Sequence, residues 1–203
     1  MAEPSTAGPV ALRTSPLSHL EERMRAAAVT GARGVTLAEL PFRTMVNVRV
    51  DPASEAAGRI GRALGEPLPR RCGDTAAHGH RTAVWLGPDE WLVLSRDDPG
   101  ALTGALREAL SGDPGSVVDV SANRTTLELS GPSAREVLEK GCPLDLHPRA
   151  FGPGRAVSTT VGPVAVLLWQ TDDAPTYRLL PRSSFADYLA RWLIDAMSEY
   201  GRP

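Results

Sequence analysis

The order of strand-like and helix-like segments constrains the fold of this chain more than any other feature of its sequence. Two stretches with strand-like apolar patterns are followed by one with helical spacing, and this order occurs four times, over residues 35–64, 83–110, 117–140 and about 164–198. Such an order is typical of an α+β fold rather than of regularly alternating parallel βα units. It predicts repeated strand-strand-helix units in antiparallel or mixed sheets, with helices on one side. Two ferredoxin-like halves would fit this order.

Residues 44–50 show the strand pattern most clearly. Val46, Val48 and Val50 fall on one face and Asn47 and Arg49 on the other, which is typical of a half-buried β-strand. Other short apolar or alternating runs are bounded by turn residues and predict strands as well. These strands are expected over residues 35–40, 83–86, 91–95, 117–120, 126–129, 156–161, 164–169 and 176–180.

Turn residues bound the predicted helices. Ser130 is expected to cap the helix that follows it, with Pro132 in its first turn. Residues 65–79 contain several Pro and Gly but show no periodicity, which predicts a loop. Helices are expected over residues 16–30, 51–64, 99–110, 132–140 and 182–200. The last helix is expected to bury Phe185, Leu189, Trp192, Leu193 and Met197.

Length and composition favour one globular domain. Residues 1–14 are rich in Pro, Ala, Ser and Gly and predict a flexible tail, whereas residues 15–203 predict a single domain. The formal net charge of −2 gives no electrostatic reason to expect nucleic acid or an anionic membrane as a partner. No apolar run approaches the ~20 residues of a membrane helix. Because the N-terminus lacks a secretory signal pattern and the two cysteines form no disulfide framework, we expect a cytoplasmic protein.

Motifs for metal or nucleotide binding are missing from the sequence. His78 and His80 lie one residue apart, without the additional closely spaced Cys or His that a structural zinc site needs. No G-x-G-x-x-G follows a predicted strand, and no G-x-x-x-x-G-K-[ST] occurs. We therefore expect neither a metal site nor a cofactor site in this chain.

Two groups of residues invite a catalytic interpretation. Cys142 lies near Lys140, and a neighbouring ammonium group lowers the pKa of a thiol and makes it reactive. The K-G-C motif resembles a cysteine motif of the iron–sulfur-assembly branch of the aminomethyltransferase superfamily, but the match ends after these three residues, which favours a buried or half-buried structural cysteine. Asp145 and His147 could orient an imidazole for base catalysis, but a turn that hydrogen-bonds itself explains them without a nucleophile. We expect no catalytic residue in this chain.

Five motifs, taken together, resemble those of one known family. They are D-V-S-A-N-R-T-T-L-E-L-S-G-P at 119–132, V-L-E-K-G-C-P-L-D-L-H-P at 137–148, F-G-P-G-R at 151–155, W-Q-T-D-D-A-P-T-Y-R-L-L-P-R-S-S-F at 169–185 and W-L-G-P-D-E-W-L-V-L at 85–94. With them the chain resembles the gamma subunit of heterotetrameric sarcosine oxidase, over roughly residues 16–200. More distantly, it is similar to the folate-binding domain of the glycine-cleavage aminomethyltransferase, which implies the fold of that domain.

The resemblance implies a non-catalytic, structural subunit. The complex would oxidatively demethylate sarcosine to glycine with O2, giving hydrogen peroxide and either formaldehyde or 5,10-methylenetetrahydrofolate. The alpha, beta and delta subunits would be the partners, with FAD, FMN and NAD in the two large subunits and zinc in the smallest. A related oxidase that acts on dimethylglycine or octopine is a further hypothesis.

The alternative function is that of a self-standing, folate-dependent aminomethyltransferase-like protein. Such relatives hold the pterin edge with an acidic residue and the ring in an aromatic or aliphatic slot. Asp119, Glu90, Trp85 and Trp91 are the side chains available for these roles. As core and rim residues of a sheet, the two tryptophans also need no ligand.

Two polar turns are the candidates for contact with partner subunits. A Pro-containing hairpin loop over 169–178 is surrounded by aromatic and Arg residues, a mixture that is enriched at protein interfaces. A second polar turn is predicted between two apolar strands. The predicted interface residues are Asn123, Arg124, Trp169, Asp172, Asp173, Tyr177 and Arg178.

Overall fold

The computed structural model describes residues 13–201, with ten strands and five α-helices in that part of the chain. The strands are β1 (Thr36–Glu39), β2 (Thr44–Val50), β3 (Thr75–His78), β4 (Arg81–Gly87), β5 (Glu90–Ser95), β6 (Gly115–Asp119), β7 (Leu127–Ser130), β8 (Ala156–Val161), β9 (Val164–Asp172) and β10 (Thr176–Pro181). The α-helices are α1 (Glu21–Ala26), α2 (Glu55–Leu64), α3 (Pro99–Leu110), α4 (Ala134–Glu139) and α5 (Ala186–Met197). Short 3₁₀ helices are η2 (Ser18–Leu20), η3 (Ser183–Phe185) and η4 (Ser198–Gly201).

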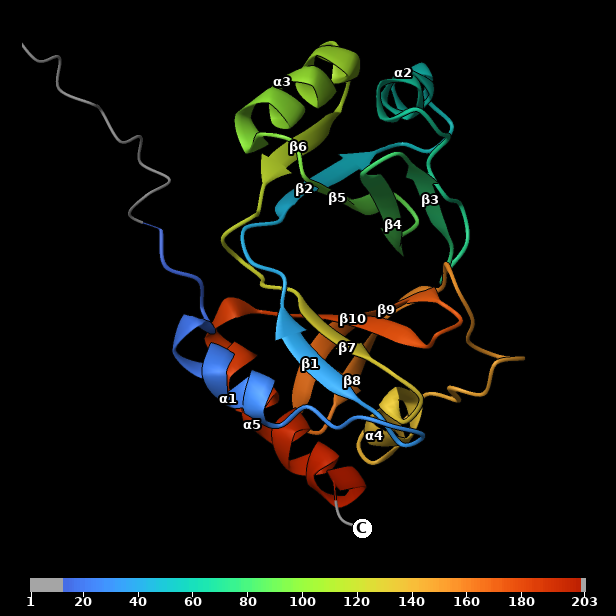
Figure 1. Ribbon diagram of the computed structural model, residues 1–203. Coiled ribbons are helices and arrows are strands. Elements are labelled where there is room, and N and C mark those ends of the chain that lie inside the picture. Colours follow the sequence, from blue (N-terminus) through green and yellow to red (C-terminus); the bar gives the residue numbers. More distant parts are fainter. Residues whose placement is uncertain (1–12, 202–203) are drawn as a thin grey trace, which may run out of the picture.

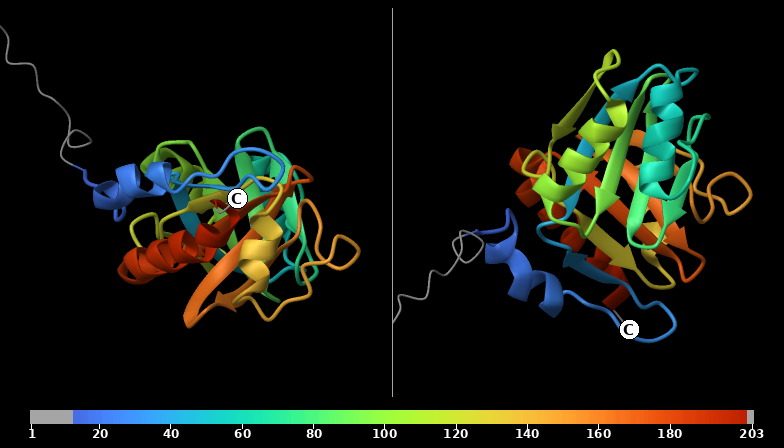
Figure 2. Two further views of the ribbon diagram at one scale, coloured as in Figure 1. Left: turned by 60° about the horizontal axis from the view of Figure 1, so that its bottom comes forward. Right: turned by 90° about the horizontal axis from the view of Figure 1, so that it is seen from above.

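These elements form four layers, with two sheets in the middle and helices on the outside (Figure 1). One sheet has the strand order β3-β4-β5-β2-β6 and is covered by α2 and α3, which lie side by side over it (Figure 2). The other has the order β1-β7-β10-β9-β8 and is covered by α1, α4 and α5. Every pairing of neighbouring strands is antiparallel. The predicted α+β fold, with helices on one side of each sheet, is confirmed.

Three apolar clusters fill the spaces between the layers. Alternate residues of each strand point to opposite faces, so each sheet contributes one face to a helix layer and the other to the opposite sheet. The cluster under α2 and α3 includes Ile60, Trp91 and Leu106, and the cluster under the other helices is the largest. The cluster between the sheets is formed by Met45, Val84, Leu92, Leu94, Ala156, Leu167 and Leu180.

The chain crosses between the sheets twice, which the predicted units did not anticipate. β1 and β2 follow one another in sequence but belong to different sheets, and so do β6 and β7. The two crossovers lie side by side, where the Leu40 amide donates to the Thr126 carbonyl at 2.8 Å. Residues 35–64 and 117–140 therefore contain no hairpin. The sequence did not predict this, because apolar periodicity indicates which face of a strand is buried but not which strand it pairs with.

The division of residues 15–203 into two ferredoxin-like halves stays a prediction. Each sheet has five strands, but β1 comes from the N-terminal part of the chain and pairs with β7 in the sheet that otherwise holds residues 127–181. The predicted flexible tail falls mainly on residues 1–12, which lie outside the described residues. Among residues 13–201, no helix is long and apolar enough to cross a membrane.

Several predicted element boundaries need correction. The first helix is shorter than the predicted 16–30, since it consists of η2 and α1 and ends at Ala26. The predicted loop 65–79 ends in an edge strand, β3, none of whose residues is buried, so that it lacks an apolar alternation. The predicted burial of Phe185 was wrong, because this residue lies in η3, ahead of α5, and is 53% exposed.

Ser130 does not cap α4 as predicted. Its hydroxyl lies 2.9 Å from the hydroxyl of Thr36 on the neighbouring strand β1. The N-cap position of α4 is Ser133, and no side chain donates or accepts a capping hydrogen bond there. The motif S-G-P thus ends strand β7 rather than starting the helix, with Gly131 in the turn at a φ of +117°.

Candidate functional site

The predicted hairpin loop exists as the turn between β9 and β10. At its tip Asp172 accepts a hydrogen bond from the Ala174 amide at 2.9 Å, and Asp173 is exposed. Burial acts to raise the pKa of Asp172, but hydrogen bonds from Ala174, Thr176 and Thr171 outweigh it and hold the pKa below its ordinary value. The turn is thus stabilised by its own side chains and presents carboxylates to solvent.

Trp169, Tyr177 and Arg178 follow from this turn but point in different directions. Trp169 and Arg178 are cross-strand partners on the face toward the other sheet, with the guanidinium carbon 5.0 Å from the indole centroid. Arg178 also donates to Glu128 at 3.0 Å. Tyr177 lies on the opposite face, fully buried under the helices with its hydroxyl 3.3 Å from Arg135 Nε. As a predicted interface residue Tyr177 needs correction, because it exposes no surface.

Asn123 and Arg124 lie in the predicted polar turn, which forms part of the crossover between β6 and β7. Asn123 is exposed, and its carbonyl accepts a hydrogen bond from the Ser183 amide at 2.9 Å. Arg124 is half-buried and donates to the Leu180 carbonyl at 2.7 Å. Burial and the nearby Arg182 lower the pKa of Arg124. Arg124 therefore ties the crossover to β10, and Asn123 faces outward.

Two exposed aromatic residues beside this crossover were missed by the sequence analysis. Phe185 and Tyr188 are 53% and 52% exposed and lie three residues apart at the start of α5. Ser183 holds this end of the helix against the crossover, since its hydroxyl donates to the Ala122 carbonyl at 2.9 Å. We call Asn123, Phe185 and Tyr188 the crossover surface. The buried set predicted for this helix left out Tyr188 but wrongly included Phe185.

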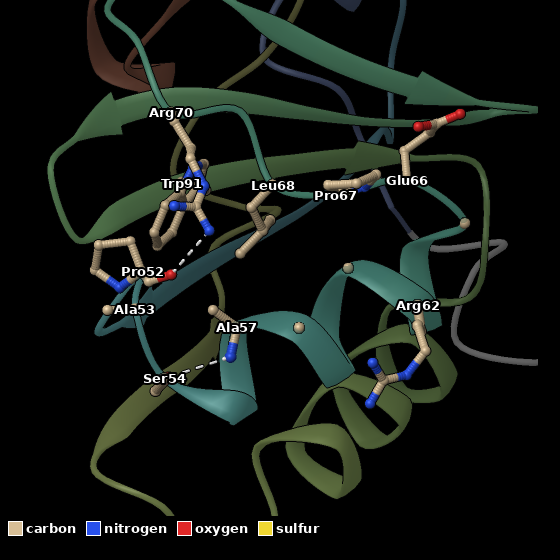
Figure 3. A pocket seen from close by; sticks show the side chains of 13 residues that line it. Pro52, Ala53, Ser54, Ala57, Arg62, Glu66, Pro67, Leu68, Arg70 and Trp91 are labelled. Carbon is tan, nitrogen blue, oxygen red and sulfur yellow. Dashed lines mark hydrogen bonds between the residues drawn. The ribbon is translucent and has the colours of Figure 1, made fainter.

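A groove with a volume of about 550 Å³ lies between α2 and the segment that follows it (Figure 3). The groove exists because α2 presents Ala57, Gly58 and Gly61 on this side, and these residues leave room above the helix. Trp91 forms part of the opposite wall, and Arg70 donates to the Pro52 carbonyl at 3.3 Å across one end.

Comparisons with known proteins agree with one another. The sarcosine oxidase, gamma subunit family matches residues 46–199. A sarcosine oxidase subunit gamma from Arthrobacter sp. is 49% identical over 193 residues, which cover 95% of this chain and 93% of that protein. This chain belongs to the sarcosine oxidase gamma subunit family.

Solved structures extend this result. A chain of the heterotetrameric sarcosine oxidase from Corynebacterium sp. U-96, in complex with pyrrole 2-carboxylate, superposes with a TM-score of 0.91 and 45% identity, covering 95% of this chain and 98% of that one. The glycine cleavage system aminomethyltransferase T from Bartonella henselae superposes with a TM-score of 0.65 at 16% identity, covering 90% of this chain and 57% of that one. This second likeness concerns the fold alone, and it confirms the expected aminomethyltransferase-like fold.

In this gamma-family chain the four candidate folate residues do not converge on one site. Trp85 and Trp91 are cross-strand partners, but Trp91 is buried and donates to the Pro69 carbonyl at 2.7 Å. Glu90 accepts from Asn47 at 2.7 Å. Asp119 accepts from the amide and hydroxyl of Ser121. Glu90 and Asp119 pair with β2 residues three positions apart, roughly 10 Å along the strand.

The two groups with a catalytic interpretation make local structural contacts. Cys142 is 8% exposed and belongs to the core under α1, α4 and α5. Lys140 donates to the Ala196 carbonyl and lies 3.0 Å from a Glu199 oxygen. Asp145 accepts from the His147 amide at 2.9 Å, which confirms the self-bonded turn. Among residues 13–201, no group of three His, Cys, Asp or Glu side chains could hold a metal ion.

Asp97 is a carboxylate near the junction of the sheets that contacts three side chains. It lies 2.7 Å from His80 Nε2 and accepts hydrogen bonds from Arg81 at 2.7 Å and Ser95 at 2.8 Å. Burial acts to raise the pKa of Asp97, but the hydrogen bonds from His80, Arg81 and Ser95 outweigh burial and lower the pKa to about 2.

Replacing Asp97 with Asn should therefore make stability less dependent on pH. Since the pKa of Asp97 is lower in the folded state than in the unfolded chain, its contribution is complete above about pH 5 and disappears as the pH falls toward 2. We expect D97N to lower the free energy of unfolding at pH 7 by at most about 2 kcal/mol, and less at pH 3. Urea unfolding across this pH range measures the difference. D89N, which removes the charge of a more exposed ion pair, is the control. A loss of stability in D97N that is the same at pH 3 and pH 7 would contradict this explanation.

Proposed function

We propose that this chain is the structural, non-catalytic subunit of a heterotetrameric enzyme that oxidatively demethylates sarcosine to glycine with O2. The observation that carries the proposal is the superposition on a chain of heterotetrameric sarcosine oxidase, at a TM-score of 0.91 over 98% of that chain. A match of this length and identity extends through the core and the surface, and so supports a shared assembly as well as a shared fold.

The proposal assigns the chemistry to partner subunits. The alpha and beta subunits would hold FAD, FMN and NAD, and the delta subunit would hold zinc. The complex would act in the cytoplasm, producing hydrogen peroxide and either formaldehyde or 5,10-methylenetetrahydrofolate. Two observations support a structural role for this chain: Cys142 belongs to the core, and the ring of His147 accepts a hydrogen bond from the Arg149 amide of its own turn.

The crossover surface is the part of the chain that we propose to contact a large subunit. Exposed aromatic residues are enriched at protein interfaces, because they bury a large area at a low cost in conformational entropy. Ser183, two residues before Phe185, donates to the Asn123 and Ala122 carbonyls, and these hydrogen bonds attach the start of α5 to the crossover. Asp172 and Asp173 at the hairpin tip offer a second, charged contact.

The double variant F185A/Y188A tests this surface. Because both side chains are about half exposed, we expect the free energy of unfolding to change by less than about 1 kcal/mol, whereas association with the co-expressed partner subunits should weaken at least tenfold. Affinity purification through a tag on this chain, followed by quantification of the partners, measures association. R62A, on the exposed side of α2, is the control. Undiminished recovery of partners with F185A/Y188A would show that the interface lies elsewhere.

A second experiment separates the accessory role from the alternative folate function. The isolated chain is titrated with tetrahydrofolate while its tryptophan fluorescence is recorded, since Trp91 borders the groove and Trp85 is its cross-strand partner. The proposal predicts no saturable change at micromolar concentrations. Saturable binding would favour a self-standing, folate-dependent protein.

A further inference from the structure

A second cavity lies where the two sheets meet and has a volume of about 340 Å³. Its walls come from both sheets and from the crossover between them. Thr82 and Leu94 line it from β4 and β5, and Trp169 and Arg178 line it from β9 and β10. Elements distant in sequence thus converge on it, and the surrounding sheets hold its walls in place.

The cavity is lined by three guanidinium groups, those of Arg43, Arg96 and Arg178. Arg178 has an anionic partner in Glu128, at 3.0 Å. Within residues 13–201, neither Arg43 nor Arg96 forms an ion pair. Burial lowers the pKa of Arg43, and the charges of Arg96 and Arg178 lower it further, while Glu128 opposes them. The cavity therefore holds more positive than negative charge.

Two buried hydrogen-bonding groups of the cavity residues also lack a partner within the described chain. They are the hydroxyl of Thr126, a residue 3% exposed, and the indole N–H of Trp169. A buried polar group without a partner costs about 1–3 kcal/mol, so such groups are rare in folded proteins. An indole N–H can only donate, and a guanidinium can only donate. The indole N–H of Trp169 and the hydroxyl of Thr126 have almost no accessible surface of their own. The guanidinium groups of Arg43 and Arg96, which line the cavity without an ion-pair partner in the described part of the chain, can be satisfied only by a ligand that supplies acceptors.

The shape and polarity of the walls narrow the class of ligand. Leu40, Leu94 and Leu180 and the ring of Trp169 make part of the lining apolar. The planar guanidinium group pairs with carboxylates in a two-point geometry. Phosphate sites commonly use backbone amides at the start of a helix, whereas this cavity is lined from strands, turns and the crossover. A carboxylate attached to a small apolar group matches both parts of the lining.

We propose that the cavity between the sheets binds a carboxylate, with Arg43 and Arg96 as its charge partners and the ring of Trp169 as part of its apolar wall. The carboxylate belongs either to a small organic acid or to an acidic side chain of a partner subunit. The second source rests on the proposed function, and the first does not. In the ligand-free chain, the crowded guanidinium groups repel one another.

The test uses the full chain, with isobutyrate as the probe and isothermal titration calorimetry as the measurement. We expect saturable binding of isobutyrate in the millimolar range, and none of isobutyramide, which has nearly the same shape but no charge. R43Q and R96Q should each weaken binding at least tenfold, and W169F should weaken it less. R23Q, at an exposed position on α1, should bind as the wild type does.

Thermal unfolding distinguishes a ligand-binding role of Arg43 from a purely structural one. R43Q should raise the melting temperature of the ligand-free chain, because it removes a charge that Arg96 and Arg178 repel, while isobutyrate should stabilise the wild type but not R43Q. If Arg43 had only a structural role, R43Q would lower the melting temperature.

The assembled complex distinguishes the two sources of the carboxylate. If the site serves a small acid, the complex binds isobutyrate as the chain alone does. If a partner side chain occupies it, the chain binds isobutyrate but the complex does not, and R43Q weakens assembly. Absence of saturable isobutyrate binding to the isolated wild-type chain would overturn the proposal, as would binding of inorganic phosphate in its place or equal binding of isobutyramide. Each of these failures leaves the accessory-subunit proposal standing, because that proposal is tested by co-purification.

Discussion

Replacing Gly131 with alanine is expected to lower the free energy of unfolding by about 3 kcal/mol or more. Gly131 adopts a φ of +117° between β7 and α4, a conformation that side chains rarely adopt. An added Cβ would lie 2.5 Å from the Gly34 carbonyl oxygen and 3.1 Å from the Val35 Cα. Because both atoms belong to the backbone that leads into β1, neither can move without disturbing the pairing of β1 with β7.

Gly104 provides a matched control with the opposite expected sign. It lies in the middle of α3, and a Cβ added there meets no atom within 4 Å. G104A should therefore raise the free energy of unfolding by up to about 1 kcal/mol, since alanine favours the helix more than glycine does. Urea unfolding followed by circular dichroism measures both variants. A stability of G131A within about 0.5 kcal/mol of the wild type would contradict the close approach of the two backbones.

Replacing Leu167 with alanine should cost about 3 kcal/mol, because this residue packs between the two sheets. Leu167 is 1% exposed on β9 and belongs to the cluster that also contains Leu92 and Leu180. Truncation removes buried apolar surface and leaves a cavity that two rigid sheets cannot close. L167V, which removes less, should cost about 1 kcal/mol and remains measurable if L167A fails to fold.

V118A is the control for L167A, because Val118 also lies on a strand but is 45% exposed. Its effect should stay within about 0.5 kcal/mol. Chemical denaturation of the three variants under the same conditions gives the comparison. If L167A and V118A had similar effects, the two sheets would not share the packed core that this fold requires.

The elements that could be predicted from the sequence are those whose periodicity is determined by one buried face. The pattern of Val46, Val48 and Val50 predicted β2, and the leucine spacing of residues 99–110 predicted α3 with the bounds that the structure has. The edge strand β3 was missed because none of its residues is buried and its sequence shows no apolar alternation. The assignment of strands to sheets was also missed, since β1 and β7 pair across about 90 residues of intervening sequence.

The site residues were predictable only where local sequence decides the geometry. The self-bonded turn of Asp145 and His147 followed from residue types that commonly form such turns. The direction of Tyr177, by contrast, depends on which face of β10 is covered by helices, and this is a tertiary property. Likewise, Arg43 and Arg178 line the same cavity only because the two sheets stack on each other. Short-range sequence patterns do not predict such long-range proximity.

The most direct test of the central claim is purification of the tagged full-length chain from its native cells, with an absorbance scan and a sarcosine oxidation assay of the eluate. Membership of a sarcosine oxidase gamma subunit family, with a near full-length structural match, predicts that larger subunits co-purify, that the eluate shows flavin absorbance, and that it oxidises sarcosine. A colourless chain that purifies alone and lacks this activity would contradict the claim that it is an accessory subunit of a sarcosine-oxidising complex.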